Sequence, residues 1–287
     1  MNHLSFSKPV ENATLRILSL GAGVQSSVMA LMAAKGEIGP RPDAMIFADT
    51  QWEPDGVMEH LDWLEGEVIR LTNGQMPLYK VTAGDIRADH INGLNSTGQR
   101  FASMPLYTAG GGGMGRRQCT SEYKIDPVRK KVRELLGVDK GKRVPKTVTV
   151  EQWLGISTDE IQRLKDSRDK WCQHRWPLIE EGMSRQDCLT WWRNNYPERE
   201  LAKSACVVCP FKSNAEWRYL RDSQPHHWLE AVNFDAGIRE NGSKFRKMDA
   251  QQFVHRSAVP LSEADLSTPE DRGQMSFLDE CEGMCGI

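Results

Sequence analysis

Short apolar runs alternate with amphipathic stretches over the first 160 residues of the chain. The runs are too short for helices and end at glycine or polar residues, as buried strands do. Four strands are expected, at residues 15–20, 44–48, 77–81 and 147–156. Three helices are expected between them, at residues 25–32, 54–71 and 125–136. Strands that alternate with helices predict an α/β fold with a doubly wound, mostly parallel sheet.

The pattern changes after about residue 165, where the sequence becomes rich in tryptophan and no strand is predicted. Helices are expected at residues 184–195, 214–221 and 225–240. The chain therefore divides into an α/β domain, residues 1–165, and a helical region, residues 166–287, that contains most of the cysteines. Residues 84–118 have no clear period and include a glycine run, which favours a mobile active-site loop over a plain surface loop. Ser157 and Glu160 have the spacing of a helix capping box.

The turn between the first strand and the first helix is the first candidate site. Gly21, Ala22 and Gly23 form a tight turn of small residues directly before a helix N-terminus. Free N–H groups and the positive end of the helix dipole make such a turn an anion site, which the hydroxyls of Ser26 and Ser27 can complete. The spacing is neither that of a dinucleotide fingerprint nor that of a Walker A loop. A purely structural turn is the alternative.

Asp49 and Thr50 follow the second expected strand, at a position that faces the ligand crevice in open α/β sheets. Asp49 can accept a hydrogen bond from an adenine amino group or a ribose hydroxyl. It can equally cap the turn that follows. The sequence alone does not decide between these two roles.

Composition and charge narrow the class of protein. The 287 residues are 39% hydrophobic and 26% charged with a net charge of −2, which indicates a soluble globular protein without an overall basic field. Residues 124–146 are a local exception, with nine basic against three acidic residues and a net charge of +6. This segment is either a solvated helix face or a nucleic-acid contact. No window approaches the ~18 apolar residues of a membrane helix and no signal-peptide core is present, so a cytoplasmic protein with no membrane partner is expected.

The seven cysteines are candidates for metal or redox chemistry, because structural disulfides are rare in the cytoplasm. Cys206 and Cys209 form a C-x-x-C pair followed by proline, which fits an iron–sulfur site, half of a zinc site or a dithiol redox pair. Zinc would take its other ligands from Cys281 and Cys285, and a cluster would use Cys119. The remaining two, Cys172 and Cys188, are predicted to be ordinary buried thiols.

Several of these motifs together resemble one family. The stretch 15–27, the pair Asp49-Thr50 and the segment 116–127, which contains Cys119 and Lys124, look like the PP-loop ATP pyrophosphatase superfamily and its phosphoadenosine-phosphosulfate (PAPS) reductase-like family. Residues 154–163, 175–179 and 203–211 and the cysteine tail resemble a phage and prophage group of that family. The resemblance implies a Rossmann-like sheet of the adenine nucleotide alpha hydrolase type, with residues 1–165 as the nucleotide-binding domain.

The resemblance also implies the site residues. ATP or a related adenine nucleotide would contact Ser19, Gly21, Ala22, Gly23, Val24, Gln25, Ser26, Ser27, Asp49, Thr50, Arg116 and Arg117. Catalytic roles are expected for Cys285, Cys119 and Lys124, and metal ligation for Cys119, Cys206, Cys209, Cys281 and Cys285.

Two positions depart from the family pattern. Gln25 stands where the family often has aspartate, and a neutral amide does not hold Mg²⁺ as a carboxylate does, so Mg²⁺ is only a further candidate cofactor. Thr120 replaces the second cysteine of an adjacent pair. A four-cysteine [4Fe-4S] cluster would then need Cys281 or Cys285, and otherwise one iron would stay open, as in sulfur-transferring relatives.

Three functions follow from these observations. The first is ATP-dependent sulfur transfer to a nucleic-acid acceptor, with a [4Fe-4S] cluster on Cys119, Cys206 and Cys209 and a separate sulfur donor. The second is a sulfonucleotide reductase that releases sulfite, with Cys285 as nucleophile and a thioredoxin-type thiol as reductant. The third is a non-catalytic nucleotide-binding module stabilised by zinc. A homodimer is a candidate assembly for each.

Overall fold

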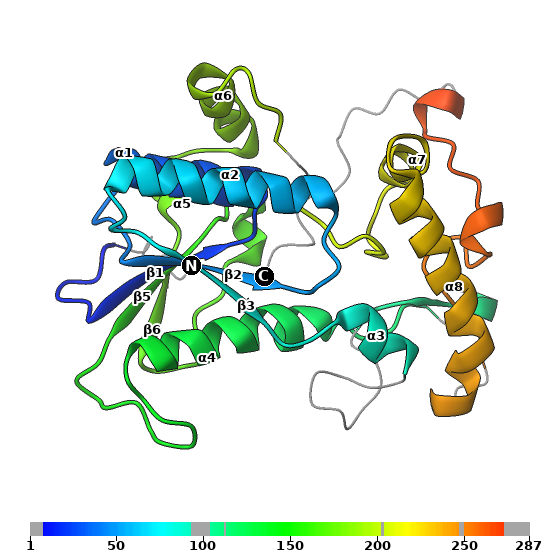
Figure 1. The fold of residues 1–287 in the computed structure, drawn as a ribbon, viewed down its shortest axis with the longest axis horizontal. Coiled ribbons are helices and arrows are strands. Elements are labelled where there is room, and N and C mark those ends of the chain that lie inside the picture. The colour runs from blue at the N-terminus through cyan, green and yellow to red at the C-terminus, as the bar shows by residue number, and fades with distance from the viewer. Residues whose placement is uncertain (1–7, 93–103, 112, 202–203, 247–249, 273–287) are drawn as a thin grey trace, which may run out of the picture. The chain divides into compact units, whose positions relative to one another are not determined.

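The computed structural model describes residues 8–92, 104–111, 113–201, 204–246 and 250–272, and the side chains of these residues except 241–246 (Figure 1). The chain forms two compact units. The sheet unit consists of residues 1–48, 55–81 and 127–204, and the cysteine unit of residues 49–54, 82–126 and 205–287. This division differs from the expected boundary at residue 165, because each unit is assembled from segments that are separated in sequence.

The sheet unit contains a five-stranded sheet in the order β3-β2-β1-β5-β6. Its strands are β1 (Leu15–Leu20), β2 (Ala44–Asp49), β3 (Leu78–Thr82), β5 (Val150–Leu154) and β6 (Cys172–Arg175). β1 pairs in parallel with β2 and with β5, and β5 pairs in parallel with β6. The expected α/β class, with a mostly parallel sheet, is therefore confirmed.

The prediction that no strand follows residue 165 is wrong, because β6 forms the edge of this sheet. Its sequence lacks apolar alternation, and its two buried positions are Cys172 and Arg175. The Arg175 guanidinium is neutralised by Glu151 at 3.3 Å and by Glu180 at 2.7 Å. An ion pair therefore takes the place of an apolar residue, and the hydrophobic pattern does not reveal the strand.

Helices of the sheet unit pack on both faces of the sheet (Figure 1). They are α1 (Val24–Lys35), α2 (Asp55–Thr72), α4 (Asp126–Leu135), α5 (Pro177–Glu180) and α6 (Arg185–Asn195). Alternate residues of β1 face opposite sides: Leu18 packs in the cluster with α1 and α2, and Ile17 in the cluster that includes Val128 and Val132 of α4. This alternation is the period-2 geometry of a strand.

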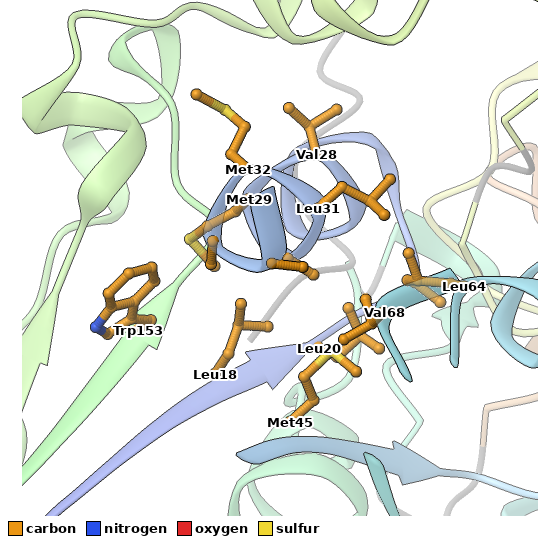
Figure 2. Packing of buried hydrophobic residues seen from close by; sticks show 14 of the residues in the cluster. Leu18, Leu20, Val28, Met29, Leu31, Met32, Met45, Leu64, Val68 and Trp153 are labelled. Carbon is orange, nitrogen blue, oxygen red and sulfur yellow. The ribbon is translucent and has the colours of Figure 1, made fainter. Parts of the chain in front are cut away.

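α1 is buried on almost all sides. This burial is possible because the helix carries no charged residue before Lys35. Figure 2 shows Met29 and Leu31 of α1 near Leu18 of β1 and Leu64 of α2. The helix that follows the candidate anion turn is thus anchored in the main core. Gly36 ends α1 in the left-handed region, at φ 77°.

The cysteine unit is built around a second hydrophobic cluster that includes Trp52, Tyr123, Trp217 and Phe234. Its elements are α3 (Ile86–Ile91), β4 (Tyr107–Thr108), a π-helix (Thr120–Ile125), α7 (Asn214–Ser223), α8 (Pro225–Arg246) and β7 (Gln252–Phe253), with β4 antiparallel to β7. β7 is a second strand beyond residue 165 that the sequence does not predict.

Two local expectations are corrected. The stretch 84–118, expected to be a loop, contains α3, which is too short to show a helical period and begins at the cap Asp85. Ser157 makes no side-chain cap, so the predicted capping box with Glu160 is wrong. Capping boxes form instead at Ser184 with Asp187 and at Ser213 with Glu216. Within the described ranges, no helix has the length and apolar character needed to cross a bilayer.

Candidate functional site

The turn from β1 to α1 lies where the strand order reverses. β2 and β3 extend the sheet on one side of β1, and β5 and β6 extend it on the other. Ligands of open α/β sheets bind outside the carboxyl ends of the strands at such a point. Ala22 adopts φ 54° in this turn, a left-handed conformation that costs a non-glycine residue about 1–2 kcal/mol. Gly23 follows in an extended conformation, so α1 begins without a side-chain cap.

Two serines, Ser26 and Ser204, hold the turn in shape, and Ser19 bonds to the neighbouring strand. The Ser26 hydroxyl accepts a hydrogen bond from the Gly21 amide and donates to the Gly23 carbonyl, both at 3.2 Å. The Ser204 hydroxyl donates to the Gly21 carbonyl. Ser19 accepts from the Gln152 amide at 2.7 Å. These hydroxyls therefore fix the backbone that an anion would meet.

Ser27 faces the core. It is fully buried, and its hydroxyl lies 2.9 Å from Nε2 of His60. Burial, followed by the charge of the nearby Arg199, lowers the pKa of His60 to about 4, so the imidazole is neutral at pH 7. Of the two serines that the sequence offers as hydroxyl donors, only Ser26 is bonded within the turn.

Gln25 is tied to the segment after β5. Its Nε2 donates to Glu160 at 3.2 Å and to Ser157 at 3.4 Å, and its Oε1 accepts from Arg185 at 3.4 Å. Glu160 is buried and also pairs with Arg163 at 2.5 Å. A carboxylate is therefore present next to Gln25, although the helix itself supplies only an amide.

Gly155 allows β5 to end against the start of α1. A Cβ atom at this position would lie 3.0 Å from the backbone nitrogen and the Cα of Ser26. Such a contact would push on the first turn of α1, so only glycine fits without displacement. The close approach sets the spacing between the two loops that flank the point of strand reversal.

Asp49 and Thr50, at the end of β2, make different contacts. The Asp49 carboxylate accepts from the Gln51 amide at 2.6 Å, which is the local turn contact that the sequence allowed as one alternative. Its contact with a nucleotide stays a prediction. The Thr50 hydroxyl is buried and donates to Glu53 Oε1 at 3.0 Å. Thr50 thus belongs to a second group of polar side chains.

That second group, called here the thiol–carboxylate cluster, consists of Thr50, Glu53, Cys119, Lys124 and Cys206 of the cysteine unit. The Cys206 Sγ lies 3.4 Å from the Thr50 hydroxyl and 3.5 Å from Glu53 Oε1. The Lys124 ammonium lies 4.0 Å from the same carboxylate oxygen. Burial, followed by the charge of Glu53, raises the pKa of the Cys206 thiol to about 12.

A π-helix places Cys119 and Lys124 in this cluster. Cys119 is the N-cap of the π-helix Thr120–Ile125, and Lys124 lies in its last turn. π-helical turns occur frequently at functional sites. The Tyr123 hydroxyl between them donates to Asp89 at 2.5 Å, which fixes the π-helix against α3.

The C-x-x-C turn is held by its own backbone and by its neighbours. The Cys209 amide donates to the Cys206 carbonyl at 3.1 Å, and the Val207 amide donates to the Trp52 carbonyl at 3.0 Å. The Tyr107 hydroxyl donates to the Pro210 carbonyl at 3.3 Å. Arg117 stacks on Phe211 with 5.3 Å between its guanidinium carbon and the ring centre, whereas Arg116 is exposed. The C-x-x-C segment and Arg117 therefore meet in one unit.

The cluster combines thiols with a buried carboxylate. Glu53 is buried, and its Oε2 has no hydrogen-bond partner. A thiol that binds a metal loses its proton, because the charge of the ion outweighs the burial that otherwise keeps it neutral. Two thiols and a carboxylate with one unpaired oxygen are groups that a bound cation stabilises. Cys119, Cys206 and Cys209 would hold an iron–sulfur cluster or zinc, and Cys281 and Cys285, expected as further ligands, lie outside the described residues.

Cys172 and Cys188 are ordinary buried thiols, as predicted. Both are buried, and burial raises the pKa of Cys172 to about 11 and that of Cys188 to about 12. Cys172 lies in β6.

Part of the basic segment 124–146 is engaged within the chain. Arg129 pairs with Asp169, Lys131 with Glu134, and Arg133 donates to the carbonyls of residues 139 and 142. These contacts support a solvated helix face for that part. A nucleic-acid contact stays a prediction.

Sequence reasoning missed Glu53. The signal that could have found it is its position three residues after Thr50, directly after a predicted strand, in the region where ligand-binding side chains gather.

No protein-family model matches the chain, and no curated protein is significantly similar to it in sequence.

Proposed function

We propose that this protein is an enzyme of the PP-loop, PAPS reductase-like family that binds an adenine nucleotide and transfers sulfur to a nucleic-acid acceptor. The observation that carries the proposal is the thiol–carboxylate cluster, in which Cys119 and Cys206 converge with Lys124 although they are distant in sequence. The proposal includes a doubly wound, Rossmann-like sheet of the adenine nucleotide alpha hydrolase type, which the parallel pairings and the strand order support.

The nucleotide phosphates would bind at the start of α1. The uncapped helix N-terminus attracts an anion, and the serine bonds keep the turn of Gly21, Ala22 and Gly23 in one conformation. Mg²⁺ belongs to the proposal only as a further ion that would accompany the phosphates, because both oxygens of Glu160, the carboxylate beside Gln25, are already bonded within the chain. The resemblance also assigns Arg116, Arg117 and Lys124 of the cysteine unit to anionic groups of the substrate.

The reaction would take place in two steps. An acceptor oxygen attacks the α-phosphorus of ATP, which forms an adenylated acceptor and releases pyrophosphate. Hydrosulfide then displaces AMP, so a carbon–sulfur bond forms, the carbon–oxygen bond breaks and no electrons are transferred. Lys124 would stabilise the negative charge that develops on the leaving phosphate. Cys119, Cys206 and Cys209 would hold an iron–sulfur cluster, which would supply the iron chemistry for handling sulfur.

The test is anaerobic purification followed by iron, sulfide and zinc analysis and by ATP-binding calorimetry. The proposal predicts a brown protein with about four irons per chain, ATP binding, and AMP release with sulfur incorporation when hydrosulfide and a mixture of cellular RNA and DNA are added. A colourless protein with one zinc would rule out the cluster. Sulfite release from adenylyl sulfate or PAPS with a dithiol, abolished by Cys285→Ser, would replace sulfur transfer by sulfonucleotide reduction.

A further inference from the structure

Four carboxylates are buried in the described part of the chain, and one of them differs from the others. They belong to Glu53, Glu151, Glu160 and Asp235. In three of them, both carboxylate oxygens are bonded. Glu53 alone leaves one oxygen, Oε2, buried and without a hydrogen-bond partner.

The three paired carboxylates show what a structural role looks like in this protein. Glu151 accepts from the Val10 amide through Oε2 and from Trp153 and Arg175 through Oε1. Asp235 accepts from the amides of Val254 and Leu261, one on each oxygen, and pairs with Arg239. Glu160 pairs with Arg163 through Oε1 and with Gln25 through Oε2. A buried carboxylate that serves only packing is thus fully bonded here.

Glu53 uses one oxygen only. Thr50, Cys206 and Lys124 all approach Oε1, at 3.0, 3.5 and 4.0 Å. An unpaired buried oxygen of this kind costs about 1–3 kcal/mol, and more when the group is charged. Solvent water does not reduce this cost, because the Glu53 side chain is only 1% exposed. A positive group that meets Oε2 would remove it.

We propose that Glu53, through Oε2, is an oxygen ligand of the metal centre held by Cys119, Cys206 and Cys209. Carboxylate oxygen is an established ligand beside cysteine sulfur in protein metal sites. The inference rests on the proposed function for the identity of the metal as an iron–sulfur cluster, and it extends that function by a ligand outside the cysteines.

The experiment compares metal retention and electron paramagnetic resonance spectra of anaerobically prepared variants. Glu53→Gln keeps the side-chain length but lacks the charge, and Glu53→Cys replaces the oxygen ligand with a thiolate. Glu230→Gln is the matched control, because Glu230 lies in the same unit, is half exposed and pairs with Arg87. Cys281→Ser/Cys285→Ser tests the competing source of a fourth ligand.

The inference predicts that Glu53→Gln loses metal to a chelator at least about tenfold faster than the wild type. Glu53→Cys should retain metal with a changed spectrum of the reduced protein. The Glu230→Gln and double-serine proteins should match the wild type. Unchanged retention and spectrum in both Glu53 variants would overturn the inference, as would metal loss in the double-serine protein with none in Glu53→Gln.

Failure of this inference differs from failure of the proposed function. If the wild-type protein holds zinc, the sulfur-transfer proposal loses its cluster, and zinc retention in the same variants still decides the role of Glu53. If the wild type holds iron and both Glu53 variants behave as wild type, only the ligand inference fails. Circular dichroism of each variant separates loss of metal from loss of fold.

Discussion

Each unit buries a glutamate, Glu151 near the start of β5 in the sheet unit and Glu53 in the thiol–carboxylate cluster of the cysteine unit. The two carboxylates differ in their hydrogen-bond partners. Glu151 is fully buried and meets hydrogen-bond donors on both oxygens. Glu53 is buried to nearly the same extent, and its Oε2 meets none. The first arrangement stabilises the fold by itself. The second leaves one buried oxygen without a partner, and we propose that a metal ion meets it.

The largest expected effect separates these two glutamates in the metal-free protein. Glu151→Gln should lower the free energy of unfolding by about 3 kcal/mol, because it leaves Arg175 with an incomplete set of partners in the core. Glu53→Gln should leave stability unchanged or raise it, since it removes a partly unpaired buried charge. Urea denaturation of both variants measures the difference. Equal losses in the two would break the comparison.

The second prediction concerns pH and the sheet unit. The pKa of His60 is about 4 in the folded protein and about 6.5 in the unfolded chain, so the unfolded chain binds more protons between these values. The stability that His60 contributes is present above pH 6.5 and is lost as the pH falls toward 4, by about 3 kcal/mol in total. Urea midpoints from pH 7 to 4.5 should fall more steeply for the wild type than for His60→Gln. Parallel curves would show that His60 is not held neutral.

The third prediction concerns the close approach of β5 to α1. Gly155→Ala should cost about 2 kcal/mol, since its Cβ would meet the Ser26 backbone at 3.0 Å. It should also weaken ATP binding, because the displaced turn is the proposed phosphate site. Gly66→Ala is the control: Gly66 lies in α2 with no atom within 4 Å of an added Cβ. That variant should bind ATP normally and gain up to about 1 kcal/mol. Normal ATP affinity in Gly155→Ala would contradict the placement of the site.

The smallest effects come from the two capping boxes, one in each unit. Ser184→Ala and Ser213→Ala should each cost about 1 kcal/mol, because each removes the acceptor for an N3 amide. Ser184→Thr and Ser213→Thr, which keep the hydroxyl, should lose less. Thermal melts of the four variants provide the measurement, and equal melting temperatures for alanine and threonine would argue against the caps.

Much of the sheet unit could be predicted from sequence because its signals are local. The apolar runs that form β1, β2, β3 and β5 and the small residues of the turn before α1 were all recognisable. β6 was not, because Arg175 is buried by pairing with glutamates that lie elsewhere in the sequence. The division into two units was also out of reach, since it depends on contacts between distant segments.

The candidate site shows the same limit. The spacing of Cys206 and Cys209 marks a metal segment, and Cys119 was a reasonable further ligand. Nothing in the sequence shows that Glu53 lies 3.5 Å from Cys206, because the two residues are separated by 153 positions. In the same way, Ser157 and Glu160 have the spacing of a cap but bond to Gln25 instead.

The central claim is that Cys119 and Cys206 hold one metal centre, and iron analysis of matched cysteine variants tests it most directly. Cys206→Ala and Cys119→Ala should lose most of the roughly four irons per chain expected of the anaerobic wild-type protein. Cys172→Ala and Cys188→Ala, which change buried thiols outside the cluster, should keep them. Iron retained equally in all four variants, or a wild-type protein without bound metal, would contradict the account.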